Sequence, residues 1–202
     1  MLLRILPALL LAALAAGCVS KGPFEPRSTT MLWREVPDNR AVLTLGPALR
    51  PMVLAVSDRR GGQVLEQRYV LRNDTRGKGE NALTLKITAN GKAMRITSDE
   101  FLAAVSAPVG AVDVDAIQEG RNRYGSFLYV FGRPEGSPAC LFALQRLQRS
   151  VGATLPEGVN QADITLRVCS STGESDELLR LMSDWSIDPA LGDPTAQLAA
   201  GG

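Results

Sequence analysis

The acidic residues in the second half of the chain are the first candidates for chemistry. Asp113, Asp115 and Glu119 lie close together, and a second acidic group occupies 174–177. Two carboxylates on either side of a glycosidic bond can hydrolyse it, one of them acting as the acid. The second group, however, precedes a helical pattern, where the helix dipole favours acidic residues whether or not they react. We therefore predict that the chain is not an enzyme.

The sequence contains few side chains suited to binding a metal ion or a cofactor. The 202 residues include no histidine, which removes the commonest general base, the usual zinc ligand and every Ser/His or Cys/His pair. Asp113 and Asp115 alternate as calcium ligands do, but such a pair without the rest of a calcium loop is more often part of a turn. We expect no metal, no cofactor and no catalytic residue.

Cys18 is a candidate for covalent modification. It follows small residues at the end of an apolar run, and residues 1–17 have the single positive charge, apolar run and small-residue end of a signal peptide. The run is too short for a transmembrane helix. The sequence LAAGC at 14–18 resembles the lipobox of bacterial lipoproteins, which implies cleavage before Cys18 and acylation of that residue. Several acyl chains anchor a protein that one chain holds only marginally.

The surroundings of Cys18 also predict a location. Val19 stands where inner-membrane lipoproteins of Gram-negative bacteria carry aspartate. By analogy we expect an envelope lipoprotein carrying palmitate on the periplasmic face of the outer membrane. The alternative is an ordinary cleavage site with Cys18 trapped nearby. Loss of Arg4 with the leader brings the formal net charge from +1 to about zero, so we expect no nucleic-acid binding.

The other two cysteines are Cys140 and Cys169. In an oxidising envelope compartment an even pair usually forms a disulfide. A closed loop of about 29 residues corresponds to roughly 3.6 kcal/mol of stabilisation in the chain-entropy model. Two separate buried thiols are the alternative.

Arginines and aromatic residues are interleaved through the same part of the chain. Aromatic faces beside guanidinium groups can hold a sugar chain or a protein partner. The candidate binding residues are Arg133, Arg146, Arg167, Tyr124 and Tyr129. The alternative is that the aromatic rings belong to the core and the arginines to solvated strand faces.

These candidate residues must be positioned by a fold, and the composition of the chain divides it into three regions after the signal peptide. Residues 18–36 contain prolines and no sustained periodicity, which predicts a tether. Residues 37–187 are enough for a single domain. The segment 188–202 has two Asp-Pro steps and a small-residue end, so we expect a disordered tail.

Apolar residues that alternate with polar ones predict the strands. We expect strands at 41–45, 52–57, 64–71, 126–132 and around 162–169, and a hairpin of 83–87 with 94–96 around Asn90-Gly91. The segment from Cys140 fits a helix or a strand, and we favour a strand facing Cys169.

Two short helices complete the expected α+β fold of antiparallel hairpins pinned by one disulfide. Thr97 and Glu100 have the spacing of a capping box ahead of a helix at 98–106. Ser171 and Glu174 have the same spacing ahead of a second helix. Its predicted apolar face is formed by Leu178, Leu181, Met182 and Trp185.

Two regions resemble the cellulose biosynthesis proteins called BcsN, small lipoproteins of alphaproteobacteria. The first, AVLTLGPALRPMVLAVSDRRGGQVLEQRYVL, is similar to that family's Gly-Pro, arginine-containing turn and Gln/Tyr-containing strand. The second comprises ACLFALQRLQ and ADITLRVCSSTGESDELLRLMSDWSI. In the family, a cysteine opens a strand ending in Gln-Arg, and a later Arg-x-Cys precedes a helix.

The resemblance implies a role in cellulose production or export, with Cys140 and Cys169 as the family's cysteine pair. It supplies no catalytic residues. The expected function is that of a non-catalytic scaffold or binding module, whose partners are proteins of the cellulose synthase and export complex or glucan. An accessory lipoprotein of a secretion or pilus machine is the alternative.

Overall fold

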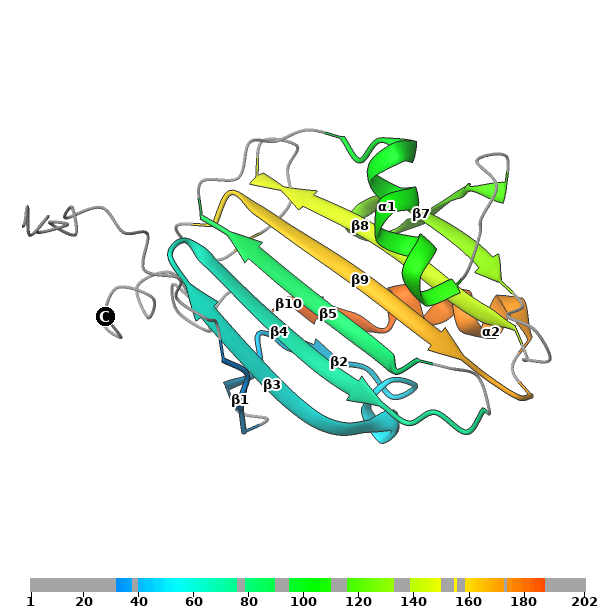
Figure 1. Cartoon of the computed structure of the whole chain (residues 1–202), viewed down its shortest axis with the longest axis horizontal. Coiled ribbons are helices and arrows are strands. Elements are labelled where there is room, and N and C mark those ends of the chain that lie inside the picture. Colours follow the sequence, from blue (N-terminus) through cyan, green and yellow to red (C-terminus); the bar gives the residue numbers. More distant parts are fainter. Residues whose placement is uncertain are drawn as a thin grey trace, which may run out of the picture. The chain divides into compact units, whose positions relative to one another are not determined.

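An eight-stranded antiparallel sheet is the centre of the fold (Figure 1). In chain order its strands are β1 (Arg34–Glu35), β3 (Val53–Gly61), β4 (Val64–Leu71), β5 (Asn81–Thr88), β6 (Gln118–Asn122), β7 (Gly125–Gly132), β8 (Cys140–Gln148) and β9 (Gln161–Cys169). In space they follow the order β1-β3-β4-β5-β9-β8-β7-β6. The strands β2 (Leu43–Leu45) and β10 (Trp185–Ile187) pair separately.

The remaining elements are short. They are the helices α1 (Ser98–Val109) and α2 (Ser175–Arg180) and the 3-10 turns η2 (Arg50–Met52) and η5 (Leu181–Ser183). This computed structural model describes residues 32–37, 40–75, 79–89, 95–109, 116–132, 139–149, 155, 159–172 and 174–187. All of them belong to one compact unit. The predicted signal peptide, Cys18 and the predicted tail at 188–202 lie outside these residues.

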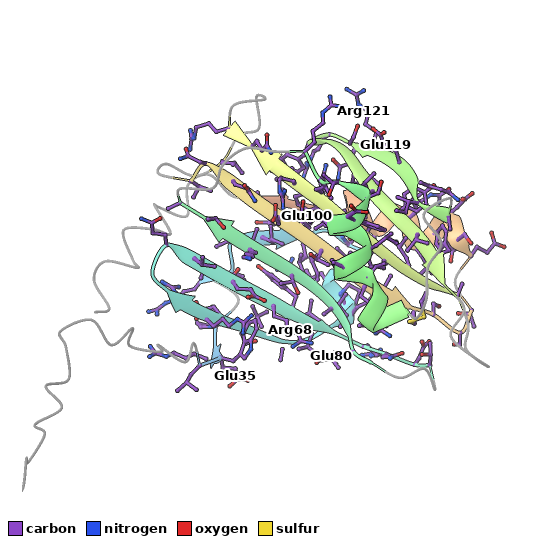
Figure 2. All side chains as sticks on the ribbon, turned by 45° about the horizontal axis from the view of Figure 1, so that its top comes forward. Glu35, Arg68, Glu80, Glu100, Glu119 and Arg121 are labelled. Carbon is purple, nitrogen blue, oxygen red and sulfur yellow. A yellow bond between two sulfur atoms is a disulfide. The ribbon has the colours of Figure 1, made fainter. Side chains whose placement is uncertain are left out.

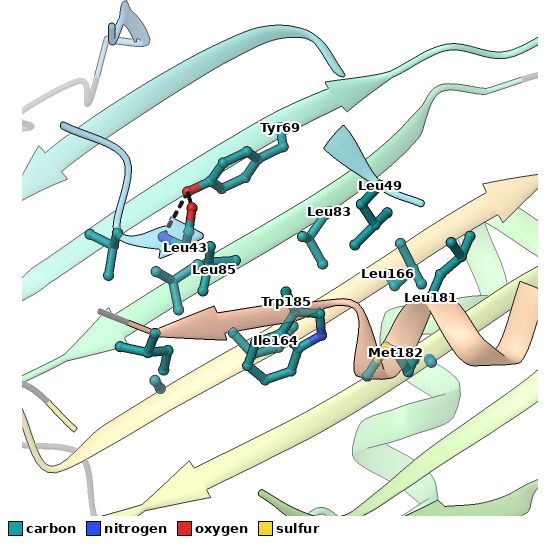
Figure 3. Close-up of a cluster of buried hydrophobic side chains, with 14 of the residues drawn as sticks. Leu43, Leu49, Tyr69, Leu83, Leu85, Ile164, Leu166, Leu181, Met182 and Trp185 are labelled. Carbon is teal, nitrogen blue, oxygen red and sulfur yellow. Dashed lines mark hydrogen bonds between the residues drawn. The ribbon is translucent and has the colours of Figure 1, made fainter. Parts of the chain in front are cut away.

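One face of the sheet carries the main core. Alternation along β9 places Ile164, Leu166 and Val168 on this face, all of them 0% exposed. The segments β2, β10 and α2 cover it, and Trp185 lies among the leucines of the sheet (Figures 1 and 3). The core therefore joins the beginning of the described chain to its end.

Polar side chains of β4 are buried in this core. Gln67 and Tyr69 of β4 are 0% and 1% exposed, yet both have partners. The Gln67 Oε1 accepts hydrogen bonds from the Val42 amide at 2.8 Å and the Tyr69 hydroxyl at 2.9 Å. The Leu43 amide donates to that hydroxyl at 2.9 Å (Figure 3). These bonds fix the chain entering β2 over the sheet, because unpaired buried polar groups are costly.

Helix α1 covers part of the other face. Its Phe101 and Val105 are 0% exposed and pack on apolar residues of β7 and β8. The rings of Phe101 and Phe142 lie 5.6 Å apart, edge to face. Figure 1 shows α1 over this part of the sheet. No described helix lies over β3, β4 or β5 on this side.

The predicted α+β class is wrong, because the protein is predominantly β. Helix α2 ends at Arg180, and Trp185, which we predicted on its apolar face, lies in strand β10. Tryptophan and isoleucine favour extended structure, and here Trp185 and Ile187 pair with Leu45 and Leu43 of β2. The apolar spacing across 178–185 therefore resembled one helix, although it comes from a helix, a 3-10 turn and a strand whose apolar residues all enter the same core.

The predicted hairpin of 83–87 with 94–96 is also wrong. Strand β5 forms, but β4 and β9 occupy its two sides. Residues 95–97 are not in a strand, and the Asn90-Gly91 turn lies outside the described residues. Pairing with β9 places β5 between two strands with a continuous apolar face, which a local hairpin cannot provide.

The segment from Cys140 is confirmed as a strand. Strand β8 lies antiparallel to β9 with Cys140 directly opposite Cys169, and the two cysteines form a disulfide. The alternative of separate thiols is therefore wrong. Besides β10, two strands of the main sheet were not predicted. Strand β6 forms one edge, and β1 forms the other, where Arg34 and Glu35 of the predicted tether pair with β3.

No helix within the described residues is long and apolar enough to cross a membrane.

Candidate functional site

A pocket of about 550 Å³ lies beside the disulfide end of β9. Its apolar lining includes the side chains of Met52, Val168, Leu178 and Leu181. Its charged lining comes from Arg72, Asp74, Glu177, Arg180 and Asp184. A volume between about 300 and 1,000 Å³ is typical of binding sites, and such sites combine apolar walls with a few polar groups.

Asp184 holds one side of this pocket together. Its Oδ2 accepts hydrogen bonds from the amides of Ala48 at 2.9 Å and Leu49 at 2.6 Å, and its backbone carbonyl accepts one from Gly46 at 2.7 Å. A Cβ on Gly46 would lie 2.0 Å from Asp184 Oδ1, so this close approach requires glycine. The end of the described chain thereby fixes the turn that precedes η2.

Asn81 binds two backbone segments that border the pocket. Its side chain is 0% exposed and donates to the carbonyls of Arg72 at 3.0 Å and Cys169 at 2.9 Å. Its Oδ1 accepts from the Cys169 amide at 2.9 Å. Because the amide of Asn81 joins the ends of β4 and β9, Arg72 is placed beside the disulfide.

The pocket therefore combines segments that are far apart in sequence, at 48–52, 72–74, 168–172 and 177–184. Its described lining has an apolar part and side chains of both charges but no aromatic ring. No group of three or more potential metal ligands occurs among the described residues. Such a lining suits a peptide segment that offers apolar and charged side chains.

Arg146, a predicted binding residue, lies on the α1 side of the sheet. Its guanidinium binds Asp163 through Nε at 2.8 Å and Nη2 at 2.9 Å, and Nη2 also binds Glu100 of α1 at 2.5 Å. The hydrogen bond to Asp163 raises the pKa of Arg146 most strongly, against the effect of burial. The bond from Arg146 likewise lowers the pKa of Glu100. Arg146 and Glu100 thus both favour their charged forms.

Arg167, another predicted binding residue, lies on the same face of the sheet and is 6% exposed. Its Nη1 donates to the Glu80 carbonyl at 2.6 Å. Gly79, with φ of 98°, lies so close that a Cβ there would be 2.8 Å from Arg167 Nη2. Burial lowers the pKa of Arg167, and the charge of Glu80 opposes that effect.

Tyr124 and Tyr129 point to the opposite face from these arginines. The Tyr124 ring stacks on Trp185 with a centroid distance of 4.8 Å, and its hydroxyl accepts a bond from the Ile187 amide at 3.1 Å. The Tyr129 hydroxyl donates to Gln118 Oε1 at 2.6 Å. Among the described residues, the predicted tyrosines and arginines are therefore not brought together on one surface.

The other predicted residues are dispersed. Cys18, Arg133, Asp113 and Asp115 lie outside the described residues. Glu119 is exposed on the edge strand β6, far in the strand order from the pocket side at β4 and β9. Sequence reasoning missed the pocket because its polar residues come from turns and helix ends, where no periodicity marks them.

The fold is a β-sheet domain with a pocket beside a disulfide-pinned strand end. A family model described as "Cellulose biosynthesis protein BcsN" matches residues 43–198. The chain belongs to this family and so takes part in cellulose biosynthesis. No curated protein and no solved structure matches the chain significantly. The matched range contains every pocket residue and both disulfide cysteines.

Proposed function

We propose that this protein is a lipid-anchored, non-catalytic accessory protein of cellulose synthesis or export, which binds a segment of another protein of that machinery in its pocket. Membership of the BcsN family supports a cellulose role over service to a secretion or pilus machine. The single observation that carries the binding role is the pocket with its mixed apolar and charged lining.

The residues of this pocket suit ligand binding better than they suit bond cleavage. The carboxylate of Asp184 already accepts two backbone hydrogen bonds, so it holds the turn at Ala48 and Leu49 in place. Asp74 and Glu177 are exposed. A general acid in a glycosidase needs an environment that keeps it protonated, usually an apolar one. Asp74 and Glu177, both exposed, do not lie in such an apolar site.

A protein segment fits the lining better than glucan does. Sugar rings are commonly held against aromatic faces, and the described lining contains none. Arg72 and Arg180 can pair with acidic side chains of a partner, while Met52 and Leu181 can contact an apolar one. We expect a peptide segment that carries both kinds of side chain.

Acylation of Cys18 would hold this domain at the envelope membrane, on the periplasmic face of the outer membrane of an alphaproteobacterium. The 13 residues from Val19 to Met31 could reach at most about 45 Å when extended. The first described strand, β1, joins the sheet at its β3 edge. The tether would therefore position the domain close to the membrane without fixing its pocket against it.

The test is co-purification from detergent-solubilised membranes. A tagged wild-type protein should bring down identified proteins of the cellulose synthase and export complex, and Arg72→Glu/Arg180→Glu should lose them at least tenfold. Arg95→Glu is the matched control, since Arg95 is exposed and does not line the pocket. Unchanged recovery with the double variant would overturn the proposed pocket. If cello-oligosaccharides bind wild type and the double variant loses this binding, glucan is the occupant instead.

A further inference from the structure

The two edges of the main sheet are built differently. At the β1 edge, strand β1 covers only Ser57 and Asp58 of β3, and a register irregularity between Val53 and Ala55 leaves Leu54 62% exposed. Bulges and short strands of this kind protect an edge against further pairing. The β6 edge is longer than β1 and has no bulge, because the five residues Gln118–Asn122 pair regularly with β7 along their whole length.

Strand β6 carries two opposite charges. Its residues are Gln-Glu-Gly-Arg-Asn, with Glu119 and Arg121 both exposed and on the same face, one on each side of Gly120. Figure 2 shows these two side chains at this end of the sheet. No described strand pairs with the outer side of β6. An antiparallel edge strand directs alternate N–H and C=O groups outward, where a further strand can bind them.

We propose that β6 pairs with β6 of a second copy of this chain, joining two sheets through a two-fold axis at Gly120. In this antiparallel register Glu119 lies opposite Arg121 of the second copy, and the symmetry makes the same pair twice. Gln118 likewise lies opposite Asn122 of the second copy. A two-fold interface must be self-complementary, and this strand is.

The charges also select the register. A slip of two residues in one direction places Glu119 opposite Glu119 of the second copy, and a slip in the other places Arg121 opposite Arg121. Like charges directly opposite one another destabilise an antiparallel pair, whereas opposite charges stabilise it. The same two residues therefore favour one register and disfavour its neighbours.

The core side of β6 is compatible with this pairing. The Phe127 ring lies over Gly120, where a Cβ would be 2.4 Å from Phe127 Cζ. Gly120 therefore has no side chain at the two-fold axis, and the ring of the neighbouring strand fills the space. Strand β6 lies at the end of the sheet opposite to β1, so the predicted tether enters away from this interface.

Native mass spectrometry of the full chain, released from detergent micelles over a concentration series, tests the proposal. Wild type should show a dimer. Glu119→Arg and Arg121→Glu should each weaken the dimer at least about tenfold, because each creates two like-charge pairs. The double variant Glu119→Arg/Arg121→Glu should restore it, and an equimolar mixture of differently tagged single variants should form the mixed dimer.

Arg34→Glu on the β1 edge is the matched control and should leave dimerisation unchanged. A chain that stays monomeric throughout the series overturns the proposal. So does a dimer that survives both single reversals, or one that the double reversal fails to restore. Pocket variants do not touch β6, so this result is independent of the proposed cellulose partner.

Discussion

Arg146 of β8 and Asp163 of β9 face each other directly and form a bidentate ion pair, with distances of 2.8 and 2.9 Å. The same guanidinium reaches Glu100 of α1. The pair lies in a row of directly opposed residues with alternating charge that continues through Lys86 and Glu66. Arg146 therefore joins α1 to the sheet, which is a structural role for a residue predicted to bind ligand.

Replacement of Arg146 and replacement of its partner Glu100 should have unequal effects on the free energy of unfolding. Arg146→Met should lower the free energy of unfolding by about 2–4 kcal/mol, because it leaves the largely buried Asp163 without its main partner. Glu100→Gln should cost less than about 1 kcal/mol, since the Glu100 side chain is 43% exposed. Urea denaturation of both variants measures the difference. Equal losses would contradict the assignment of Asp163 as the main partner.

Glu100 should also give the stability a pH dependence. Its pKa is lowered in the folded protein, chiefly by the hydrogen bond from Arg146. The unfolded chain therefore takes up a proton first as the pH falls, and the contribution of Glu100 is present above its ordinary value near 4.5 and is lost below it. The stability difference between wild type and Glu100→Gln should shrink from pH 6 to pH 3. A difference that grows on acidification would refute this sign.

The disulfide should stabilise the edge of the pocket. Cys140 and Cys169 close a loop with a sequence separation of 29, so Cys140→Ala/Cys169→Ala should lose about 2–4 kcal/mol. Dithiothreitol should destabilise wild type by a similar amount and leave the double variant unchanged. Urea denaturation with and without the reductant separates these cases, and a reductant effect on the double variant would point to another cause.

Substitution of either Asp184 or Gly46 should destabilise the turn that Asp184 holds. Asp184→Ala leaves the Ala48 and Leu49 amides without their acceptor and should cost about 1–3 kcal/mol, whereas Asp184→Asn keeps a carbonyl oxygen and should cost less. Gly46→Ala should destabilise as well, because its Cβ would clash with the Asp184 carboxylate. Thermal unfolding ranks the three. Wild-type stability of Gly46→Ala would contradict the observed close approach.

Much of the sheet could be predicted from the alternation of apolar and polar residues. The strands around 64–71, 126–132 and 162–169 agree with the structure, and Thr97 Oγ1 accepts the predicted bond from the Glu100 amide at 3.1 Å. The carboxylate of Glu100, however, binds Arg146 instead of completing a capping box. The second predicted box is not formed either, since α2 starts after Glu174 with no side-chain cap.

The sequence could not reveal which strands become neighbours. Strand β5 has an apolar face that suits several partners, and only long-range packing places it beside β9. The pocket is hidden for the same reason, because Asp184 and Ala48 are 136 residues apart and neither belongs to a recognisable motif. Gln67 and Tyr69 occupy inward positions of β4, and their polarity is explained only by the backbone of 42–43 above them.

Cellulase-sensitive glucan from a strain that lacks this gene is the most direct measure of the proposed function. Complementation with wild type should restore glucan, whereas Cys18→Ala and Arg72→Glu/Arg180→Glu should leave it low although both proteins accumulate. Arg95→Glu should restore it as wild type does. Full restoration by the pocket variant would contradict the account, and glucan that does not change when the gene is lost would remove the cellulose role altogether.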